Sequence, residues 1–353
     1  MEQTLESLRT RIAEAAATGR YLRLRGGGSK DWYGRAGHGE LLDTRAHRGV
    51  VAYEPTELVV TVRCGTPLAE LEALLATQRQ MLPFEPPHFG SAATVGGMVA
   101  SGLSGPRRQS AGAVRDYVLG MTVIDGRGRL LRFGGQVMKN VAGYDVSRLM
   151  AGSMGVLGLI AEVSLKVLPM PVAETTLRFE LDEEQAILQL NLWGGQPLPL
   201  ASSAWLDGVL YVRLSGAGAA VANACCSMGG EPADAAIWSQ LREHAHPWFS
   251  VDEGAQTLWR LSLPSATRPL ALPGSWLIEW GGGLRWLRTD ASEEAVRALA
   301  AEVGGHATRF RGADRYAQVF HPLPPALERV HRNLKHAFDP AGILNPGRLY
   351  PDL

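Results

Sequence analysis

Cysteine is scarce in this chain of 353 residues, and its three cysteines are poorly placed for disulfide formation. Cys225 and Cys226 are adjacent, a spacing that seldom allows an unstrained disulfide, and Cys64 stands alone. The sequence also lacks the CxxC spacings and clustered cysteines that hold iron–sulfur centres. We therefore expect a reducing, cytosolic compartment, and any iron–sulfur cluster should sit on another chain.

Excess charge and long apolar runs are missing as well. The 35 basic and 35 acidic residues balance, so the composition does not indicate a polyanionic partner such as nucleic acid. No apolar run approaches the roughly 20 residues needed to cross a bilayer. Residues 1–20 carry charges among their apolar positions, which predicts an amphipathic helix and not a signal peptide. We expect a cytoplasmic chain, at most peripheral to the inner face of the cytoplasmic membrane.

Short β-type runs broken by glycine and proline dominate residues 21–171. The expected strands are 21–24, 50–53, 58–62, 121–124, 130–133 and 159–167. Asp125-Gly126 predicts a hairpin over 121–133. Thr66 and Pro67 predict the start of a helix over 66–78, and a shorter helix is expected from about 145 to 150. The pattern predicts an α+β domain over residues 1–171.

Strand and helix patterns alternate in the following segment, where tryptophan becomes frequent. Strands are expected at 175–181, 209–214, 276–280 and 284–288, and helices at 183–192, 219–228 and 292–303. This order predicts a smaller antiparallel α+β cap domain of ferredoxin-like type over 172–321, although a continuation of the first domain is an alternative. Residues 322–353 are expected to form a helix, 325–338, and a turn-rich tail that returns to the first domain.

A glycine-rich loop directly follows the first expected strand. Its residues are Arg25, Gly26, Gly27, Gly28, Ser29 and Lys30. Three glycines allow consecutive backbone N–H groups to face one point, which is a cradle suited to a diphosphate. The loop is neither GxGxxG nor GxxxxGK[ST], so nicotinamide Rossmann and P-loop folds lose their main support. A glycine-rich turn without a ligand is the alternative.

Small and hydroxyl side chains gather in a second segment, residues 86–102. Small side chains permit a close approach of the backbone to a ligand. Helix-start N–H groups after Thr94 would add a second set of donors for phosphate oxygens. The alternative is a glycine-lined packing interface between a helix and a sheet.

These segments together resemble the FAD-binding half of PCMH-type flavoproteins, in the vanillyl-alcohol oxidase-like superfamily. The resemblance rests on ordered segments that span about 17–171: Pro86-Pro87, 93–97, 105–107, 114–120, Gly134-Gly135, Lys139, 143–145 and 152–158. The tail 338–347 is similar to the closing segment of the same superfamily. The resemblance implies an α+β PCMH-type domain of two subdomains, with FAD as the cofactor.

The resemblance also implies which positions contact FAD. The loop from Arg25 to Lys30 would hold the diphosphate, and the flavin and phosphates would be lined by Pro86, Ser91, Thr94, Val95, Gly96, Gly97 and Gly102. The adenine half or the dinucleotide backbone would be flanked by Gly112, Arg115, Gly155 and Ile160. A structural pair with Asp116 is an equal possibility for Arg115.

Asn345 and Arg348 would approach the isoalloxazine from the tail, although an Asx-Pro turn and a solvated charge are the alternatives. Some relatives attach FAD through a histidine in the glycine loop, but Ser29 or Lys30 stands there in this chain. We therefore expect non-covalent FAD. His38 and His47 follow the loop at a distance and are expected at the surface.

Within the superfamily, residues 139–149, the short cap and the total length are most similar to the glycolate oxidase E-subunit family. That likeness implies a complex with a longer homologous flavoprotein subunit and an iron–sulfur subunit that passes electrons toward quinone. The substrate would be a small 2-hydroxyacid: glycolate, oxidised to glyoxylate, or D-lactate. A stand-alone FAD-dependent 2-hydroxyacid oxidoreductase and a non-catalytic assembly subunit are the other two hypotheses.

Two departures from the related 2-hydroxyacid dehydrogenases bear on these hypotheses. The chain lacks their histidine-rich metal motif in the cap, so no metal is expected, and His244 and His246 are expected to be a surface pair. Met154 and Val156 replace a glutamate and a threonine that contact FAD in those enzymes. No catalytic residue can be named from the sequence. Three cap tryptophans, Trp238, Trp248 and Trp259, are either a partner-binding face or, more commonly for such side chains, buried.

Overall fold

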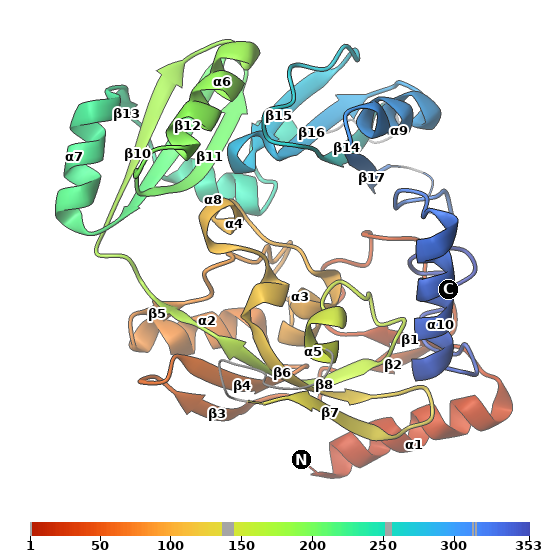
Figure 1. The fold of residues 1–353 in the computed structure, drawn as a ribbon. Coiled ribbons are helices and arrows are strands. Elements are labelled where there is room, and N and C mark those ends of the chain that lie inside the picture. Colours follow the sequence, from red (N-terminus) through yellow and green to blue (C-terminus); the bar gives the residue numbers. More distant parts are fainter. Residues whose placement is uncertain (1, 136–144, 251–255, 313, 315) are drawn as a thin grey trace.

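A computed structural model of the chain describes residues 2–135, 145–250, 256–312, 314 and 316–353. Figure 1 shows two halves: a lower half built around a five-stranded sheet and an upper half built on an eight-stranded sheet. The part of segment 139–149 before Asp145, which includes Lys139, Gly143 and Tyr144, lies outside the described residues. None of the described helices is long and apolar enough to cross a membrane.

The lower half begins with helix α1 (Glu2–Thr18), which confirms the predicted amphipathic helix. Leu8, Ile12 and Ala15 bury its apolar side against Leu22 and Ile124. Strand β1 (Leu22–Arg25) then pairs in parallel with β2 (Glu40–Asp43), a strand that the sequence did not indicate. This pair positions the glycine loop, because the loop begins where β1 ends.

The five-stranded sheet has the order β3-β4-β8-β6-β7, with every neighbouring pair antiparallel. Its strands are β3 (Val50–Glu54), β4 (Val59–Arg63), β6 (Val118–Ile124), β7 (Leu130–Gly134) and β8 (Leu159–Lys166). The predicted hairpin is confirmed, since β6 and β7 pair directly. The other elements of this half are α2 (Leu68–Thr77), β5 (Gln80–Met81), α3 (Val95–Ser101), α4 (Arg108–Ala111), α5 (Val146–Leu149) and β9 (Leu168–Pro169). Helices α2 and α3 pack against this sheet through a continuous apolar core.

The cap begins with a complete ferredoxin-like unit. Its elements are β10 (Ala173–Glu180), α6 (Glu183–Gly194), β11 (Leu200–Leu206), β12 (Val209–Gly216), α7 (Gly218–Met228) and β13 (Glu231–Pro232). The spatial order β13-β10-β12-β11, with antiparallel pairing throughout, is that of a βαββαβ ferredoxin-like sheet. The predicted type of cap is therefore confirmed.

A second group of strands repeats the same order. It contains β14 (Thr257–Ser262), β15 (Ser275–Glu279), β16 (Leu284–Thr289), α9 (Glu293–Glu302) and β17 (His306–Arg311). The spatial order β15-β16-β14-β17 matches that of the first unit, with a loop in place of the first helix. Strands β11 and β15 pair and join the two units into one eight-stranded sheet. The sequence shows no internal repeat, so this repetition is visible only in the structure.

Helices α6, α7 and α9 cover the outer face of the cap sheet, and the inner face is turned toward the lower half (Figure 1). The inner face is packed with aromatic side chains and with α8 (Ala236–Arg242). Strands β11, β14 and β17 were missed from the sequence.

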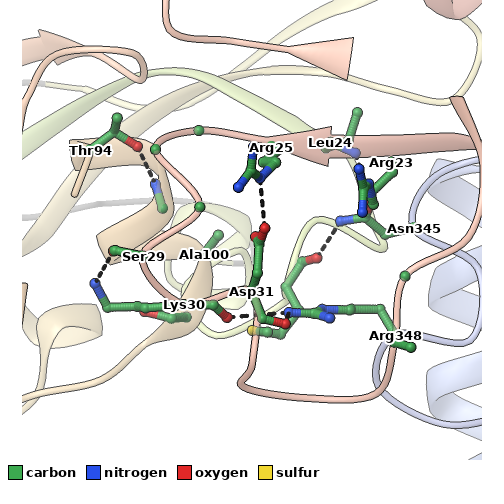
Figure 2. A pocket seen from close by; sticks show the side chains of 18 residues that line it. Arg23, Leu24, Arg25, Ser29, Lys30, Asp31, Thr94, Ala100, Asn345 and Arg348 are labelled. Carbon is green, nitrogen blue, oxygen red and sulfur yellow. Dashed lines mark hydrogen bonds and ion pairs between the residues drawn. The ribbon is translucent and has the colours of Figure 1, made fainter. Parts of the chain in front are cut away.

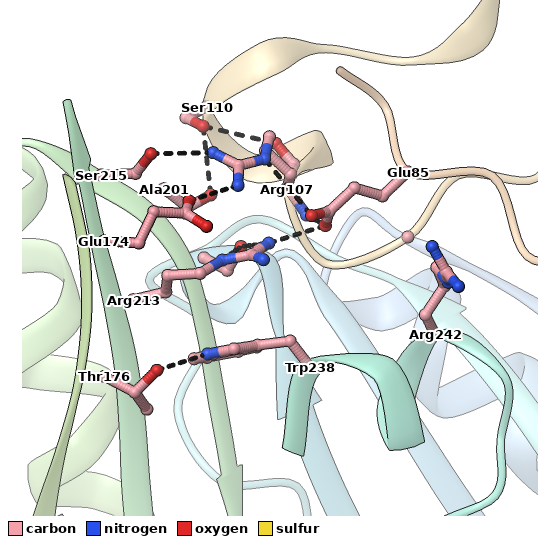
Figure 3. Close-up of polar contacts among 12 residues, drawn as sticks. Glu85, Arg107, Ser110, Glu174, Thr176, Ala201, Arg213, Ser215, Trp238 and Arg242 are labelled. Carbon is pink, nitrogen blue, oxygen red and sulfur yellow. Dashed lines mark hydrogen bonds and ion pairs between the residues drawn. The ribbon is translucent and has the colours of Figure 1, made fainter. Parts of the chain in front are cut away.

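A buried ion network joins the cap to the lower half (Figure 3). The Glu85 carboxylate accepts hydrogen bonds from Arg107 of the lower half and from Arg213 on β12, at 2.6 Å for the latter. Arg107 also forms an ion pair of 2.5 Å with Glu174 on β10. Burial acts to raise the pKa of Glu85, but the two guanidinium groups outweigh it and hold this pKa below its usual value. Glu85 is therefore ionised and anchors the cap.

The C-terminal segment returns from the cap to the lower half. Helix α10 (Pro325–Phe338) runs along the side of the molecule (Figure 1), and the buried pair Lys335–Asp339, 2.7 Å apart, fixes its end. The tail then lies beside β1, where the N–H of Leu22 donates to Ile343 O and the N–H of Asn345 donates to Leu22 O. On these contacts we propose the division 1–171, 172–321 and 322–353.

Candidate FAD-binding site

The glycine loop lines a pocket of about 180 Å³ at the end of β1 (Figure 2). Within the described part of the chain, none of the backbone N–H groups from Gly26 to Lys30 donates a hydrogen bond to another residue. Such a run of unpaired donors in a concave loop is suited to an anion such as a diphosphate. The structure therefore agrees with the cradle expected from the sequence.

Two of the loop's glycines are required by close packing. A Cβ atom on Gly27 would lie 1.4 Å from the Ala92 carbonyl oxygen, and one on Gly26 would lie 2.3 Å from Thr94 Oγ1. Any side chain at these positions would push the loop away from the segment that precedes α3. The two glycine-rich segments of the sequence are thus in direct contact with each other, on one wall of the pocket.

Two cations stand at the pocket. Arg25 pairs with Asp31 at 2.6 Å, and Lys30 Nζ donates to the His88 carbonyl at 3.1 Å. Burial lowers the pKa of Lys30 to about 8, with a smaller opposing effect from Glu243. At neutral pH the ammonium is charged, and with Arg25 it gives the pocket the sign that an anionic cofactor requires.

The start of α3 differs from the expectation. Thr94 caps the helix by accepting from the Gly97 N–H at 3.3 Å. The N–H of Val95 donates to Thr66 O and that of Gly96 to Cys64 O, so these helix-start groups already have protein acceptors. The expectation that they add a second set of phosphate donors is therefore wrong.

Two unpaired backbone N–H groups lie just before the start of α3. Among the described residues, the N–H groups of Ser91 and Ala92 have no hydrogen-bond acceptor, and both residues are exposed. Both residues follow Gly90. A Cβ atom placed on Gly90 would lie 4.0 Å from Ser29 Cβ in the glycine loop. This places a second pair of donors close to the first set.

The tail residues act through the backbone. Asn345 Oδ1 accepts from the Leu24 N–H at 2.7 Å, and Asn345 Nδ2 donates to the Met154 carbonyl at 2.6 Å. Arg348 donates to the carbonyl oxygens of Asp31, at 3.0 Å, and of Tyr33. Arg348 is thus not a solvated charge, and both tail residues line the pocket while fixing its walls.

A second hollow of about 80 Å³ adjoins the first and shares several of its lining residues. This second hollow is lined by the predicted positions Gly96, Gly155 and Ile160, among others. Cys64 also lines it, and burial raises the pKa of its thiol to about 12, so the thiol stays protonated and unreactive. Because the two hollows share lining residues, we refer to them together as the groove, which extends from the glycine loop to β8.

The predicted positions divide into two groups. The two hollows bring together Arg25, Gly26, Gly27, Gly28, Ser29, Lys30, Thr94, Gly96, Gly97, Gly155, Ile160 and Asn345. They are not lined by Pro86, Ser91, Val95, Gly102, Gly112 or Arg115. Sequence reasoning missed Arg23, Leu24, Asp31, Ala36, Gly37, Ala100 and Ser101 as lining residues.

Several positions outside the hollows have structural roles. Val95 is fully buried in the apolar core. Gly102 ends α3 with a left-handed φ of 65°, and Gly112 ends α4 with a φ of 93°. Arg115 is 65% exposed and lies 3.9 Å from Asp116, which fits the structural pair considered for it.

The histidines depart from the sequence-based expectations. His38 is exposed as expected, but His47 is buried. His244 and His246 do not form a surface pair, because His244 stacks on Phe249 with ring centroids 3.8 Å apart. Over the described ranges, no group of three or more His, Cys, Asp or Glu side chains could hold a metal ion.

The hydrophobic replacements at 154 and 156 are accommodated by packing. Met154 lines both hollows, and Val156 is buried in the core of the lower half. The cap tryptophans Trp238, Trp248 and Trp259 are all buried, which rules out their forming an exposed partner face.

Comparisons with known proteins agree with this geometry. Residues 3–134 match a family model described as an FAD binding domain. Alkyldihydroxyacetonephosphate synthase has a similar fold, with a TM-score of 0.65 over 96% of this chain and 74% of that protein, at 14% identity. The fold and the cofactor groove thus define a flavoprotein with a PCMH-type FAD-binding fold.

Sequence similarity extends over nearly the entire length. The Escherichia coli protein described as glycolate oxidase subunit GlcE is 48% identical over 348 residues, which cover 99% of this chain and 98% of that protein. The chain therefore belongs to the GlcE family of glycolate oxidase subunits. Glycolate oxidase subunit GlcD of Bacillus subtilis is 34% identical over 36% of this chain and 27% of its own length. A D-lactate dehydrogenase of Anaerostipes hadrus is 35% identical over 40% of this chain and 29% of its own length.

Proposed function

We propose that this chain is the FAD-bearing, GlcE-type component of a multi-subunit glycolate oxidase that converts glycolate to glyoxylate. The observation that carries the proposal is the 48% identity to glycolate oxidase subunit GlcE across nearly all of both chains. D-lactate is the alternative substrate, in keeping with the likeness to a D-lactate dehydrogenase.

The residues of the groove fit non-covalent FAD. The unpaired N–H groups of Gly26 to Lys30, together with the Arg25 and Lys30 cations, would hold the diphosphate. Gly155 and Ile160 would flank the remainder of the dinucleotide in the adjoining hollow. When bound, FAD supplies the acceptor for the hydride that leaves the α-carbon of a 2-hydroxyacid. The chain itself binds and orients the cofactor through the backbone of its glycine loop.

The proposal includes two partners: a longer homologous flavoprotein subunit and an iron–sulfur subunit that receives electrons. The likeness to glycolate oxidase subunit GlcD over 129 residues supports a homologous pair of subunits. A cytoplasmic location, with any membrane contact made by the partners, is part of the same proposal.

The test is to purify the chain alone and together with its two partner subunits. Acid precipitation of the isolated chain should leave flavin in solution at about one equivalent per chain. Addition of glycolate to the complex under anaerobic conditions should bleach the flavin absorbance, and a dye acceptor should restore it. A Gly27→Ala variant of this chain within the complex should lack one equivalent of flavin, with the partner's flavin retained.

Other outcomes point to the other hypotheses. A colourless chain that does not take up FAD, in a complex that still oxidises glycolate, would make this chain a non-catalytic assembly subunit. Turnover of glycolate or D-lactate with a dye by the isolated chain would make it a stand-alone oxidoreductase.

A further inference from the structure

An arginine whose guanidinium makes no described hydrogen bond lies on the inner face of the cap, near enough to Glu279 for an electrostatic interaction. Arg260, on β14, is half-buried, and no other described residue gives its guanidinium a hydrogen bond or an ion pair. Its recorded contact is with the Trp280 ring, 5.2 Å from the ring centroid. A partly desolvated guanidinium in such surroundings is costly unless an anion pairs with it. The hydrogen-bonding capacity of this guanidinium is therefore available to a bound anion.

This guanidinium lines a small cavity of about 20 Å³ between the cap and the lower half. Aromatic side chains form most of its walls: Phe89, Trp280, Trp286 and Phe310. Such walls lower the local dielectric and strengthen any charge pair formed inside. The volume holds a group about the size of one or two water molecules, which suits a carboxylate and not a larger polyanion.

Two further polar groups line the same cavity. Glu279 accepts a hydrogen bond of 2.7 Å from Trp286 Nε1, and burial raises the pKa of Glu279 to about 7 against smaller opposing effects of Trp286 and Arg260. Below about pH 7 this carboxyl is mainly protonated and can donate to an anion. His244 Nδ1 is buried with no described hydrogen-bond partner, and burial holds the pKa of His244 well below its usual value.

The cavity lies close to the FAD groove. Leu103, Ser104 and Gly105 line it and directly follow α3, and Thr94, which caps the start of α3, lines the groove. Ala100 and Ser101, at the C-terminal end of α3, also line the groove, so groove and cavity are separated by only one or two residues of the chain there. Phe89 links them as well, since it lines the cavity and lies 5.6 Å from Lys30 Nζ.

We infer that this cavity binds the carboxylate of a small monocarboxylic acid, with the Arg260 guanidinium as its anchor. The planar guanidinium can donate two parallel hydrogen bonds to a carboxylate, and Glu279 supplies a third polar contact. The inference rests on the proposed function in one respect: a 2-hydroxyacid would enter by its carboxylate and present its α-carbon toward the FAD groove. Arg260 is thus a substrate-anchoring residue that the sequence did not indicate.

The experiment titrates the FAD-loaded chain with acetate and with acetamide, its neutral counterpart of the same shape. The readout is tryptophan fluorescence, because Trp280 and Trp286 line the cavity, and isothermal calorimetry supplies the affinity. Acetate should give a saturable change and acetamide none. Arg260→Gln should weaken acetate binding by at least about tenfold, as expected for the loss of a charge-assisted hydrogen bond. Arg178→Gln, at a partly exposed arginine on β10 of the same sheet, is the matched control and should bind acetate as the wild type does.

Equal responses to acetate and acetamide, or undiminished acetate binding by Arg260→Gln, would overturn the inference. If Arg260→Gln fails to fold or to retain FAD, two other measurements test the inference. One is the acetate–acetamide comparison on the wild type. The other is acetate binding by Arg260→Lys, which keeps the positive charge but loses the planar pair of guanidinium donors. Acetate must then still be preferred by the wild type and be bound more weakly by Arg260→Lys. Glycolate oxidation by the complex without acetate binding here would sink the cavity assignment alone. Acetate binding without glycolate oxidation by any complex would sink the proposed function alone.

Discussion

Asn345 Oδ1 accepts a hydrogen bond of 2.7 Å from the backbone N–H of Leu24, so the C-terminal tail is bonded to the strand that leads into the glycine loop. The same side chain donates to the carbonyl of Met154, which lines both hollows of the groove. One amide therefore holds together three segments that are far apart in the sequence. Its own backbone is left-handed, with a φ of 44°, a conformation that asparagine tolerates better than most residues.

Replacement of this amide should affect FAD binding as well as stability. Asn345→Ala leaves the Leu24 N–H and the Met154 carbonyl without partners, and we expect a loss of about 2 kcal/mol in the free energy of unfolding. FAD affinity should fall by at least about tenfold, because the walls of the groove separate. Calorimetric unfolding and flavin titration measure the two effects. Asn223→Ala, at an exposed position of α7, should change neither; equal effects of both variants would contradict the role of Asn345.

The glycine loop tolerates no side chain at its centre. In Gly27→Ala the new Cβ would meet the Ala92 carbonyl oxygen, so the loop must move, at a cost of about 1–3 kcal/mol in stability. The displaced N–H groups should no longer converge on a diphosphate, and the purified variant should be colourless. The control is Gly194→Ala, since no atom lies within 4 Å of a Cβ built there. Retention of flavin by Gly27→Ala would show that the loop does not hold the cofactor.

Lys30 predicts a pH dependence of FAD affinity. Burial lowers the pKa of Lys30 to about 8, so the ammonium is charged below this value and neutral above it. Attraction for the diphosphate should therefore be complete below pH 8 and decline as the pH rises through 8. The dissociation constant of FAD, measured by fluorescence quenching between about pH 6.5 and 9.5, should rise in the wild type. It should be nearly flat in Lys30→Met, whereas Lys166→Met should follow the wild type.

Glu85 should be among the most sensitive positions of the domain junction. Glu85→Gln leaves the guanidinium groups of Arg107 and Arg213 without their shared carboxylate, and we expect a loss of about 3 kcal/mol in stability at pH 7. The pKa of Glu85 is held below its ordinary value of 4.5 in the folded chain. The stabilisation is therefore complete above pH 4.5 and is lost as the pH falls through the lowered pKa.

Thermal unfolding between about pH 3.5 and 8 should thus show the wild type and Glu85→Gln converging at the acidic end. Glu180→Gln is the matched control, because Glu180 is 80% exposed in its pair with Arg178 and should change stability by less than about 0.5 kcal/mol. A constant difference between wild type and Glu85→Gln over the full pH range would exclude an ionised Glu85.

Local patterns explain what the sequence predicts well. The hairpin β6–β7 follows from Asp125-Gly126, and the glycine loop follows from three consecutive glycines after a strand. These features depend on neighbouring residues alone. Strand β2 has no comparable local signal, because its place is set by parallel pairing with β1.

The errors at the site have the same origin. Val95 and Gly96 look like free helix-start donors in the sequence, yet their N–H groups meet carbonyls of a connection some 30 residues earlier in the chain. Arg348 looks like a solvated charge, but its partners lie more than 300 residues away. His47 is buried by tertiary packing, which no residue near it in the sequence indicates. Long-range contacts of this kind cannot be derived from spacing.

The return of the tail to β1 has a consequence for biosynthesis. The groove is walled by the loop after β1, the start of α3, Met154 and the tail residues Asn345 and Arg348. A ribosome makes Arg348 more than 300 residues after the glycine loop, so the growing polypeptide lacks a complete cofactor site until the whole cap has been synthesised. We therefore expect flavin to be held by all the walls of the groove only after the cap has been synthesised and the tail has returned to β1.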